Sequence, residues 1–276
     1  MPPAIYYADK KPVLIDKNAS LLTATRYLLN NNRYHAVLVE KGNKLAGVLS
    51  IRDVAKALFI IGEEAVELIE AGYLAKTLEN PAYFYATKDV IYITENENFE
   101  NALEIMVKNN IGSLPIVDSE RTVIGVLEEK QVIKAMPIYT KKPMCEYASW
   151  ELILIEEEDE ILEAIGLMVT NNIRRVVITN EDGEPIGMTT LNILIDYLTS
   201  PSSLDKLLEG DESPLSKPVK KVMLKPWITD CSYSLREIAS LLTFDPLGAV
   251  LVKDNDKYGI ITERDLLRAL RDSFSS

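Results

Sequence analysis

The stretch AVLVEKGNKLAGVLSIRD occupies residues 36–53 and reads as two short β-strands joined by a turn. Two runs of aliphatic and β-branched residues flank the turn-forming sequence KGN, which is typical of a hairpin. Gly47, in the second run, is followed by Ser50 and Asp53. Three later stretches repeat this layout around Gly125, Gly187 and Gly259: LPIVDSERTVIG, VVITNEDGEPIG and AVLVKDNDKYG. Four related hairpins therefore organise the chain.

Each hairpin is preceded by a helical pattern and by a short apolar strand. Apolar residues recur at helical spacing, so one face of each predicted helix is buried. These helices cover residues 21–29, 99–107, 161–169 and 235–242, and the stretches end at Asn32, Asn110, Asn172 and Asp245. The short strands lie at 13–15, 90–93, 152–155 and 227–229, and a second helix follows every hairpin. The sequence therefore predicts an α+β fold made of four β-α-β-β-α repeats.

Two of the predicted helices carry start signals. Ser234 and Glu237 form a capping-box pattern at the start of the fourth repeat's first helix. The acidic run Glu156–Glu160 precedes the corresponding helix of the third repeat, where negative charge is favourable. We interpret this run as a strand end and helix start rather than as a metal site, because charge runs are usually solvated.

The repeats predict a modular organisation. A small sheet cannot be covered by its own two helices, so neighbouring repeats are expected to pair through their exposed sheet faces, which gives two compact modules. An inserted helix or linker is expected after the first repeat and a polar loop after the third. The predicted boundaries are 1–58 for repeat 1, 59–82 for the insertion, 83–137 for repeat 2, 138–199 for repeat 3, 200–217 for the loop and 218–276 for repeat 4.

Composition restricts the possible environments and partners. The 276 residues carry 42 acidic and 30 basic side chains, a formal net charge of −12, which disfavours broad contact with nucleic acid but permits a local basic pocket. No apolar run is long enough to span a membrane, and no signal peptide is visible, so we expect a cytoplasmic protein. Cys145 and Cys231 show no disulfide framework or zinc spacing and are expected to be inert packing thiols.

Three strings carry a resemblance to a known family. VKKVMLKPWIT at residues 219–229, GVLSIRD at 47–53 and GIITERD at 259–265, together with the order of elements, resemble cystathionine-beta-synthase (CBS) domains. Such domains pair into Bateman modules. A chain with four of them is similar to stand-alone four-CBS proteins of archaea and to the regulatory gamma subunit of AMP-activated kinases, and the resemblance leaves no catalytic domain unaccounted for.

The resemblance implies a ligand and site residues. The family senses adenosyl compounds, here AMP, ADP, ATP, S-adenosylmethionine or methylthioadenosine, with no catalytic cofactor. In the family, a Gly-x-x-Ser/Thr-x-x-Asp string places its hydroxyl near the phosphate and its carboxylate on the ribose. The matching pairs are Ser50 with Asp53 and Thr262 with Asp265. A helix N-terminus and a carboxylate suit a phosphate and a cis-diol, yet the same pattern is also a capping box that needs no ligand.

The other two repeats depart from this string. The second has Glu128 and Gln131 at the two positions, and the third has Thr190 and Ile193. Both lack the carboxylate of the ribose position, so we expect them to bind a nucleoside poorly or not at all. One good site per module is therefore predicted.

Three further residues are candidates for ligand contact. Thr229 occupies the first-strand position where the family often has a ligand-facing hydroxyl, and we assign it to the fourth repeat's site. Arg174 stands where related proteins often place a phosphate-contacting basic residue. Arg264 lies inside the motif, although an arginine at a helix start is more often solvated. His35, the only histidine, is interpreted as a packed or surface residue rather than as an acid-base catalyst.

These observations support two functional hypotheses. The first is a regulatory module, not an enzyme, that binds an adenosyl ligand between paired repeats and signals to an effector protein or to a second copy in a homodimer. The second is an interaction scaffold, including one that docks on a ribonucleoprotein, with vestigial ligand sites. A hydrolase or transferase is the weakest reading, because no activated nucleophile, metal cluster or phosphate-cradling glycine loop is present.

Overall fold

The computed structural model describes residues 2–62, 66–135 and 143–274, and within them each repeat forms one β-α-β-β-α unit. In unit 1 the elements are β1 (Leu14–Asp16), α1 (Leu21–Asn30), β2 (His35–Glu40), β3 (Lys44–Ser50) and α2 (Ile51–Leu58). In unit 2 they are β6 (Ile93–Thr94), α4 (Phe99–Lys108), β7 (Ser113–Val117), β8 (Val123–Glu128) and α5 (Glu129–Ala135).

The second half of the chain repeats this order. Unit 3 contains β9 (Leu154–Glu156), α6 (Ile161–Thr170), β10 (Arg175–Thr179), β11 (Pro185–Thr190) and α7 (Leu191–Thr199). Unit 4 contains β12 (Trp227–Asp230), α9 (Leu235–Phe244), β13 (Ala249–Asp254), β14 (Lys257–Thr262) and α10 (Glu263–Phe274). Short 3-10 turns, η1 (Ala4–Tyr6), η2 (Ala82–Phe84), η3 (Met144–Tyr147) and η4 (Val219–Val222), precede the four units. The predicted α+β repeat is confirmed.

Each unit has the same small sheet. The first strand pairs in parallel with the second, and the second pairs antiparallel with the third through the predicted hairpin. The register places His35 opposite Ser50 and Ala249 opposite Thr262. The last strand therefore delivers the motif hydroxyl directly to the start of the following helix.

The first helix of each unit ends as the sequence predicts. Asn32, Asn110 and Asn172 adopt φ values of 49°, 53° and 54° just after α1, α4 and α6. This left-handed conformation stops a helix, and asparagine tolerates it better than most side chains. At the start of α9, Ser234 Oγ accepts from the Glu237 amide at 3.3 Å, which confirms the predicted capping box.

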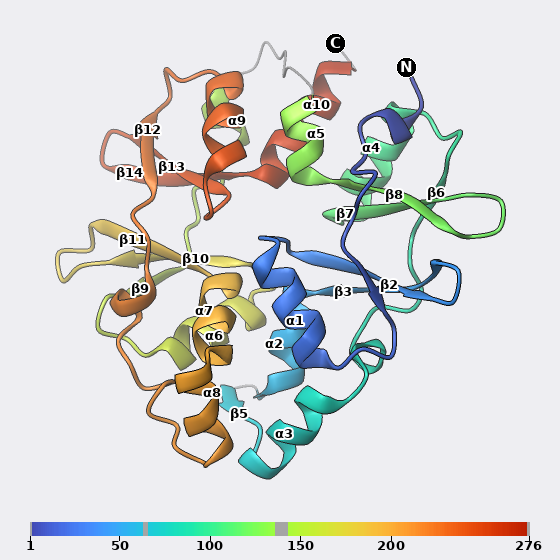
Figure 1. Ribbon diagram of the computed structural model, residues 1–276. Coiled ribbons are helices and arrows are strands. Elements are labelled where there is room, and N and C mark those ends of the chain that lie inside the picture. Colours follow the sequence, from blue (N-terminus) through green and yellow to red (C-terminus); the bar gives the residue numbers. More distant parts are fainter. Residues whose placement is uncertain (1, 63–65, 136–142, 275–276) are drawn as a thin grey trace.

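Sheets hold the units together in sequential pairs. The sheets of units 1 and 2 face one another through an apolar cluster that includes Val37, Val39 and Val126. The sheets of units 3 and 4 do the same through Val177, Met188 and Leu251. Figure 1 shows these two pairs side by side, units 3 and 4 on the left and units 1 and 2 on the right.

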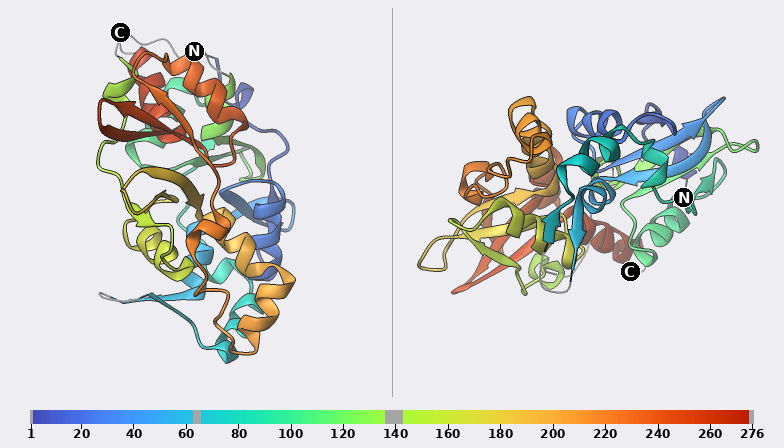
Figure 2. Two further views of the ribbon diagram at one scale, coloured as in Figure 1. Left: turned by 90° about the vertical axis from the view of Figure 1, so that its left-hand side faces the viewer. Right: turned by 90° about the horizontal axis from the view of Figure 1, so that it is seen from below.

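Helices join the two pairs to each other. One large core combines α1 and α2 of unit 1 with α6 and α7 of unit 3, and a second combines α4 and α5 with α9 and α10. The four units thus lie at the corners of a flattened body, as the face-on and side views show (Figures 1 and 2). The two predicted modules are not separate bodies, because each helix core belongs to both of them.

A leading segment of each unit crosses onto the partner's last strand. Single β-bridges join Thr87 to Val48 and Ser149 to Ile260. A Cβ atom on Gly259 would lie 2.9 Å from Trp150 Cε3, closer than real Cβ contacts. The repeated glycine therefore marks the place where the partner unit's leading segment passes closely over the strand.

The two inserted segments are more regular than the sequence suggests. The first forms a hairpin of β4 (Phe59–Ile61) and β5 (Val66–Leu68), followed by α3 (Ala71–Glu79). The segment expected as a polar loop contains α8 (Pro201–Leu208). Leu74, Leu78, Leu204 and Leu207 of α3 and α8 are buried in the core shared by units 1 and 3. Both insertions extend this core at one end of the body.

The prediction for the cysteines is wrong. Cys145 and Cys231 form a disulfide with a Cα–Cα distance of 5.5 Å, although 86 residues separate them. Cys145 lies in η3, which leads into unit 3, and Cys231 directly follows β12 of unit 4. Pairing of these two units brings together cysteines whose spacing suggests no partnership.

Candidate functional site

A cavity of about 300 Å³ lies between units 3 and 4, and we call it the unit-4 cleft because it contains Thr262 and Asp265. Four apolar side chains line it, and we call them the apolar slot: Leu152, Ile153, Val177 and Ile260. Five arginines also line it: Arg52, Arg174, Arg175, Arg264 and Arg268. The cleft therefore combines apolar surface with a cluster of guanidinium groups.

Thr262 and Asp265 meet at the start of α10. The backbone N–H and the hydroxyl of Thr262 donate to Asp265 Oδ2 at 2.9 and 2.7 Å. Asp265 is 4% exposed, and burial raises the pKa of its carboxyl group. Its Oδ1 accepts from Arg268 at 3.1 Å. The pair caps the helix, and Asp265 also lines the cleft.

The corresponding unit-1 cleft, about 250 Å³, lies between units 1 and 2 and contains Ser50 and Asp53. The Ser50 hydroxyl donates to Asp53 Oδ2 at 2.7 Å, and Ser50 Oγ accepts from the Asp53 amide at 3.2 Å. The leading segment of unit 2 lines the opposite wall with Thr87, Asp89 and Ile91. Ser50 and Asp53 therefore form a complete capping box, whereas Thr262 and Asp265 share only the bonds donated by Thr262, and both pairs line cavities.

A buried ion cluster lies where the four units meet. Glu129, at the start of α5 and 3% exposed, accepts from Arg174 at 2.9 Å and also from Arg264. Burial opposes ionisation, but the two guanidinium groups outweigh it and hold the pKa of Glu129 at about 2. The Arg174 guanidinium also lies 4.4 Å from the centroid of the Tyr34 ring. This carboxylate from unit 2 therefore orients arginines of units 3 and 4.

Several charged atoms of this cluster have no hydrogen-bond partner among the described residues. They are Arg174 Nη1, Arg175 Nε and Nη2, and Glu263 Oε2, and all are buried. Arg175 Nη2 lies 3.9 Å from Glu263 Oε2, too far for a hydrogen bond. Burial raises the pKa of Glu263. The unit-4 cleft is thus lined by two arginines that retain unused donors.

The motif positions of units 2 and 3 have other residues and contacts. Arg33 pairs with Asp9 at 2.7 Å and with Glu128, the residue at the unit-2 motif position. In unit 3, the side chain of Met223 packs over Gly187 in the position that Trp150 takes over Gly259. At the position of Asp265 the two units have Gln131 and Ile193, so neither supplies a carboxylate there.

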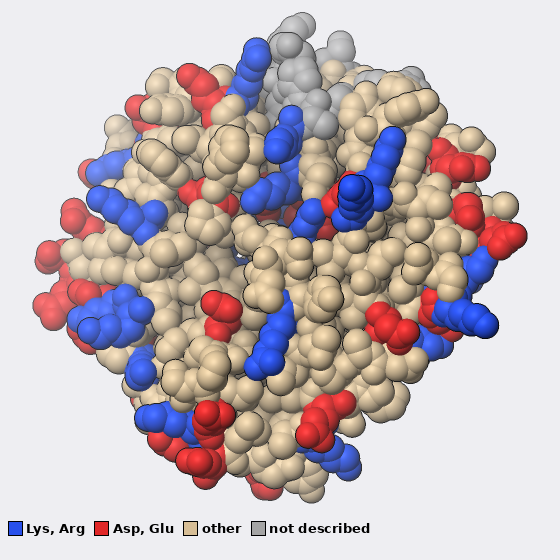
Figure 3. Space-filling model, in the orientation of Figure 1, with Lys and Arg blue, Asp and Glu red and all other residues tan. Residues whose placement is uncertain are grey.

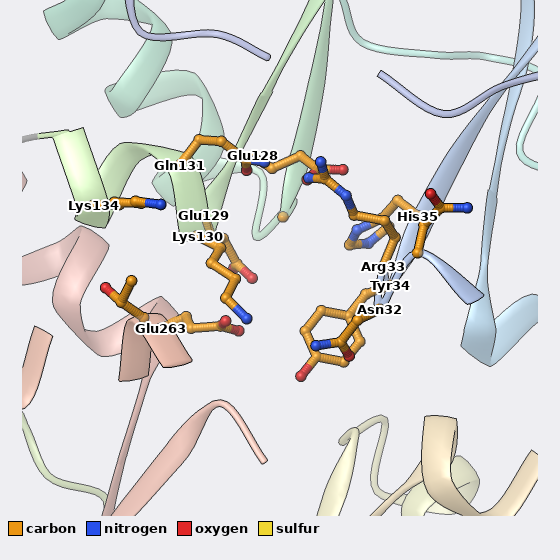
Figure 4. Close-up of a pocket in the computed structure, with 13 residues that line it drawn as sticks. Asn32, Arg33, Tyr34, His35, Glu128, Glu129, Lys130, Gln131, Lys134 and Glu263 are labelled. Carbon is orange, nitrogen blue, oxygen red and sulfur yellow. The ribbon is translucent and has the colours of Figure 1, made fainter. Parts of the chain in front are cut away.

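A third cavity of about 290 Å³ borders the Arg33 ion pairs. Figure 4 shows Lys130 and Lys134 of α5 and Glu263 of α10 on one side, with Tyr34 and His35 on the other. Its walls mix cationic and anionic groups. The face of the molecule seen in Figure 3 is also mixed in charge, with several Lys and Arg side chains near its centre and Asp and Glu side chains among and around them.

The structure brings together most of the predicted site residues but not all of them. Thr262, Asp265, Arg174 and Arg264 line the unit-4 cleft, and Ser50 and Asp53 line the unit-1 cleft. Thr229 lines neither. It is buried on β12, where its hydroxyl donates to the Leu251 carbonyl at 3.3 Å.

Several lining residues were not singled out from the sequence. The leading segment of the partner unit supplies Ser149 to the unit-4 cleft and Thr87 to the unit-1 cleft. Arg52, which lies inside the unit-1 motif as Arg264 lies inside the unit-4 motif, lines both clefts. Ser149 and Thr87 each stand three residues before the predicted first strand of their own unit, at 152–155 and 90–93. This shared spacing is the sequence signal that could have found them.

The described residues contain no group of three His, Cys, Asp or Glu side chains that could hold a metal ion. None of the helices in the described ranges has the length and apolar character needed to cross a membrane.

Family comparison matches the CBS domain at residues 5–60, 83–138, 145–200 and 219–272. An uncharacterised 33.4 kDa protein in a ribosomal RNA operon of Thermofilum pendens is 26% identical over 268 residues, covering 94% of this chain and 88% of the relative. Protein MJ1225 of Methanocaldococcus jannaschii is 27% identical over 273 residues, covering 95% and 96% of the two chains.

Solved structures show the same architecture. The crystal structure of MJ1225, which has been suggested as an archaeal homologue of the gamma subunit of AMP-activated kinase, superposes with a TM-score of 0.83 at 22% identity, covering 96% of this chain and 99% of that one. An uncharacterised protein from Pyrococcus horikoshii gives 0.63 at 16% identity, covering 97% and 99%. These similarities extend over all four units.

Proposed function

The chain belongs to the CBS domain family, and from this we propose that it is a regulatory module whose unit-1 and unit-4 clefts bind phosphorylated adenosyl compounds. Ligand binding would alter the arrangement of the paired units and thereby signal to a partner protein or to a second copy. The output is a change of conformation, not turnover.

The unused donors of Arg174 and Arg175 carry this proposal. Both side chains line the unit-4 cleft, yet the buried atoms Arg174 Nη1 and Arg175 Nε and Nη2 donate to no acceptor among the described residues. A buried polar group left unpaired costs roughly 1–3 kcal/mol, and more when it is charged. A small turn of the two guanidinium groups toward the cleft would let these donors reach a phosphate, which supplies several acceptor oxygens.

The rest of the unit-4 cleft suits a nucleoside attached to that phosphate. The apolar slot of Leu152, Ile153, Val177 and Ile260 can accept a base. Asp265 borders the same space, and a carboxylate has lone pairs for a ribose diol in addition to those used in the cap. One cavity therefore contains suitable contacts for the base, the ribose and the phosphate.

Charge favours some adenosyl compounds over others. Five arginines line the unit-4 cleft, against the carboxylates of Glu151 and Asp265. S-adenosylmethionine brings a positive sulfonium, and methylthioadenosine brings no phosphate. We therefore expect AMP, ADP and ATP to bind more tightly than either of these two.

The position of the cleft suggests how binding would reach a partner. Ser149, Leu152 and Arg174 come from unit 3, whereas Thr262 and Asp265 come from unit 4. A ligand that contacts both walls stabilises one relative arrangement of the two units. Because unit 3 shares a helix core with unit 1, a shift between units 3 and 4 also acts on the first module.

A calorimetric and thermal-shift panel of AMP, ADP, ATP, S-adenosylmethionine and methylthioadenosine tests the proposal. We expect the three nucleotides to bind and to raise the melting temperature. Asp265→Ala and Asp53→Ala should each weaken one site. Glu237→Ala is a matched control, because it removes the acidic residue of the α9 capping box, which lines neither cleft.

A second function, an interaction scaffold with vestigial ligand sites, is favoured by one observation. In unit 2 the motif position holds Glu128, which pairs with Arg33, and neither unit 2 nor unit 3 has a carboxylate at the position of Asp265. If none of the five compounds shifts the melting temperature, the scaffold becomes the better explanation and the sensor proposal is wrong.

A further inference from the structure

The unit-1 and unit-4 clefts are not isolated from each other. Three residues, Arg52, Asn110 and Asn172, line both of them. Arg52 belongs to unit 1, and its Nη1 donates to the Asn172 carbonyl of unit 3 at 2.9 Å. In the same way, Arg264 of unit 4 donates to Asn110 of unit 2. The two clefts therefore share a common wall of Arg52, Asn110 and Asn172, to which Arg264 of unit 4 is hydrogen-bonded.

The two clefts differ greatly in charge. Arg52 and Lys56 are the only cationic residues lining the unit-1 cleft, and Asp53 and Asp89 oppose them. His35 also lines it but is neutral, because burial and the nearby arginines lower its pKa to about 3. The unit-4 cleft has four arginines besides Arg52. The unit-1 cleft therefore depends on Arg52 for phosphate, whereas the unit-4 cleft does not.

Arg52 is held among like charges. Besides burial, the neighbouring guanidinium groups of Arg174 and Arg264 lower the pKa of Arg52. Arg174 and Arg264 share the carboxylate of Glu129, whereas Arg52 has no ion pair among the described residues. An anion bound beside Arg174 and Arg264 would attract Arg52 and relieve this repulsion. Such an anion would sit on the unit-4 side of the common wall.

We infer that the two clefts compete for Arg52, so that a phosphorylated ligand in the unit-4 cleft weakens phosphate binding in the unit-1 cleft. The inference rests on the proposed function. Because coupling between sites is reciprocal, each ligand weakens the other by the same factor. Adenosine, which has no phosphate, is not affected.

Calorimetric titration with AMP and with adenosine tests the competition. The unit-1 cleft is measured alone in Asp265→Asn and the unit-4 cleft alone in Asp53→Asn, with folding checked by circular dichroism. In the wild type, AMP should fill the unit-4 cleft in a first, tighter step and the unit-1 cleft in a second, weaker step. We expect the affinity of the unit-1 cleft for AMP to be about ten-fold higher in Asp265→Asn than in this second step, a common size for coupling between sites. Adenosine should show less than a two-fold difference.

Removal of the shared cation should remove the coupling. In an Arg52→Gln background, the same comparison is expected to give less than a two-fold difference for AMP. Arg26→Gln is the matched control, since Arg26 is exposed on α1 and lines neither cleft. It also removes one positive charge and should retain the ten-fold effect.

A measurement that needs no variant supplements the titrations. Trp150 adjoins Ser149 and Glu151 of the unit-4 cleft, and units 1 and 2 contain no tryptophan. Tryptophan fluorescence should therefore saturate with the first, tighter step, while calorimetry records both steps.

The outcomes separate the two proposals. Two AMP steps of equal or increasing affinity would overturn the competition and leave the sensor function standing. Loss of all AMP binding in a folded Asp265→Asn variant would also overturn it, because the unit-1 cleft would then not be a site. Absence of binding by every nucleotide in the wild type would reject the proposed function itself.

Discussion

His35 shows how tightly the centre of the molecule is packed. A Cβ atom on Gly112 would lie 2.9 Å from both His35 Cε1 and Glu129 Oε2. Only a glycine at this position lets unit 2 approach the imidazole of unit 1. The lone histidine is thus a packed residue, as we predicted, and it sits among arginines that disfavour its charged form.

This environment predicts an unusual titration. Burial, assisted by Arg174, lowers the pKa of His35 to about 3. Because His35 is the only histidine, its imidazole protons can be followed by NMR without assignment. We expect their chemical shifts to remain those of the neutral ring down to about pH 4. A midpoint near 6.5, the ordinary value for histidine, would contradict the packing.

The same shift makes stability depend on pH. With a folded pKa below the unfolded value, His35 contributes stability above about pH 6.5, and this contribution is lost as the pH falls toward 3. The slope approaches 1.4 kcal/mol per pH unit. Urea unfolding between pH 7 and pH 4 should show a smaller loss for His35→Asn than for the wild type. Parallel losses in the two proteins would exclude this linkage.

Single residues also show where sequence reasoning reached its limit. The motif residues Thr262 and Asp265 were recognisable because they are near neighbours in one string. Thr229 was assigned to their site from its strand position, but it does not line the cleft, and its buried hydroxyl donates to the Leu251 carbonyl instead. The hydroxyl that lines the cleft, Ser149, comes from another unit and lies more than a hundred residues away in the chain. Only the pairing of units 3 and 4 brings it there.

Helix starts offer a direct test of whether the motif only caps. Ser50 begins α2 and Ser234 begins α9, and each accepts from the amide of an acidic residue three positions later. Ser50→Ala and Ser234→Ala should each lower the free energy of unfolding by about 1 kcal/mol, since each removes one cap. Only Ser50→Ala should weaken AMP binding, because Ser234 lines neither cleft. Unchanged affinity in both variants would mean that Ser50 is only a cap.

The disulfide gives a second prediction for local elements. It ties η3, which leads into the unit-3 wall of the unit-4 cleft, to the turn after β12. Reduction with dithiothreitol should lower the free energy of unfolding by about 2–4 kcal/mol, since the bond constrains a long loop in the unfolded chain. The Cys145→Ser, Cys231→Ser double variant should be unaffected by the reductant. Two reactive thiols in the untreated protein would contradict the bond.

The insertions explain why elements outside the repeat were harder to predict. The sequence after the third repeat is rich in Ser, Asp and Glu, so it resembles a loop, yet Leu204 and Leu207 face the shared helix core. Short helices gain most of their stability from such packing and not from propensity. The apolar surface that stabilises α8 belongs to other units and is invisible in its own sequence.

At the scale of the entire chain, repetition was predictable and assembly was not. The spacing of the glycines and of the helical patterns was sufficient to predict four units and to predict that neighbouring units pair through their sheets. The joining of the pairs through helices was not predicted, because a buried helix face looks the same whether it packs inside one unit or between two. The ion cluster around Glu129 exists only through that joining, since its members come from different units.

The shared helix cores predict that the protein unfolds as one body. Leu28, on α1 of unit 1, is fully buried in the core that unit 1 shares with unit 3. Leu28→Ala should cost about 2–5 kcal/mol. Both tryptophans, Trp150 and Trp227, belong to units 3 and 4. If the helix cores couple the modules, the denaturation midpoint measured by tryptophan fluorescence must fall although the substitution lies in unit 1.

Tyr27→Ala is the matched control for this experiment, because Tyr27 lies on the same helix and is 52% exposed. It should leave the fluorescence midpoint within error of the wild type. Far-ultraviolet circular dichroism, which reports all four units, should give the same midpoint as fluorescence in every variant. If the circular dichroism of Leu28→Ala began to change at a lower denaturant concentration while the fluorescence midpoint stayed at the wild-type value, that result would show that the modules unfold separately. Cooperative unfolding, by contrast, would supply the mechanical connection that a signal between the two clefts requires.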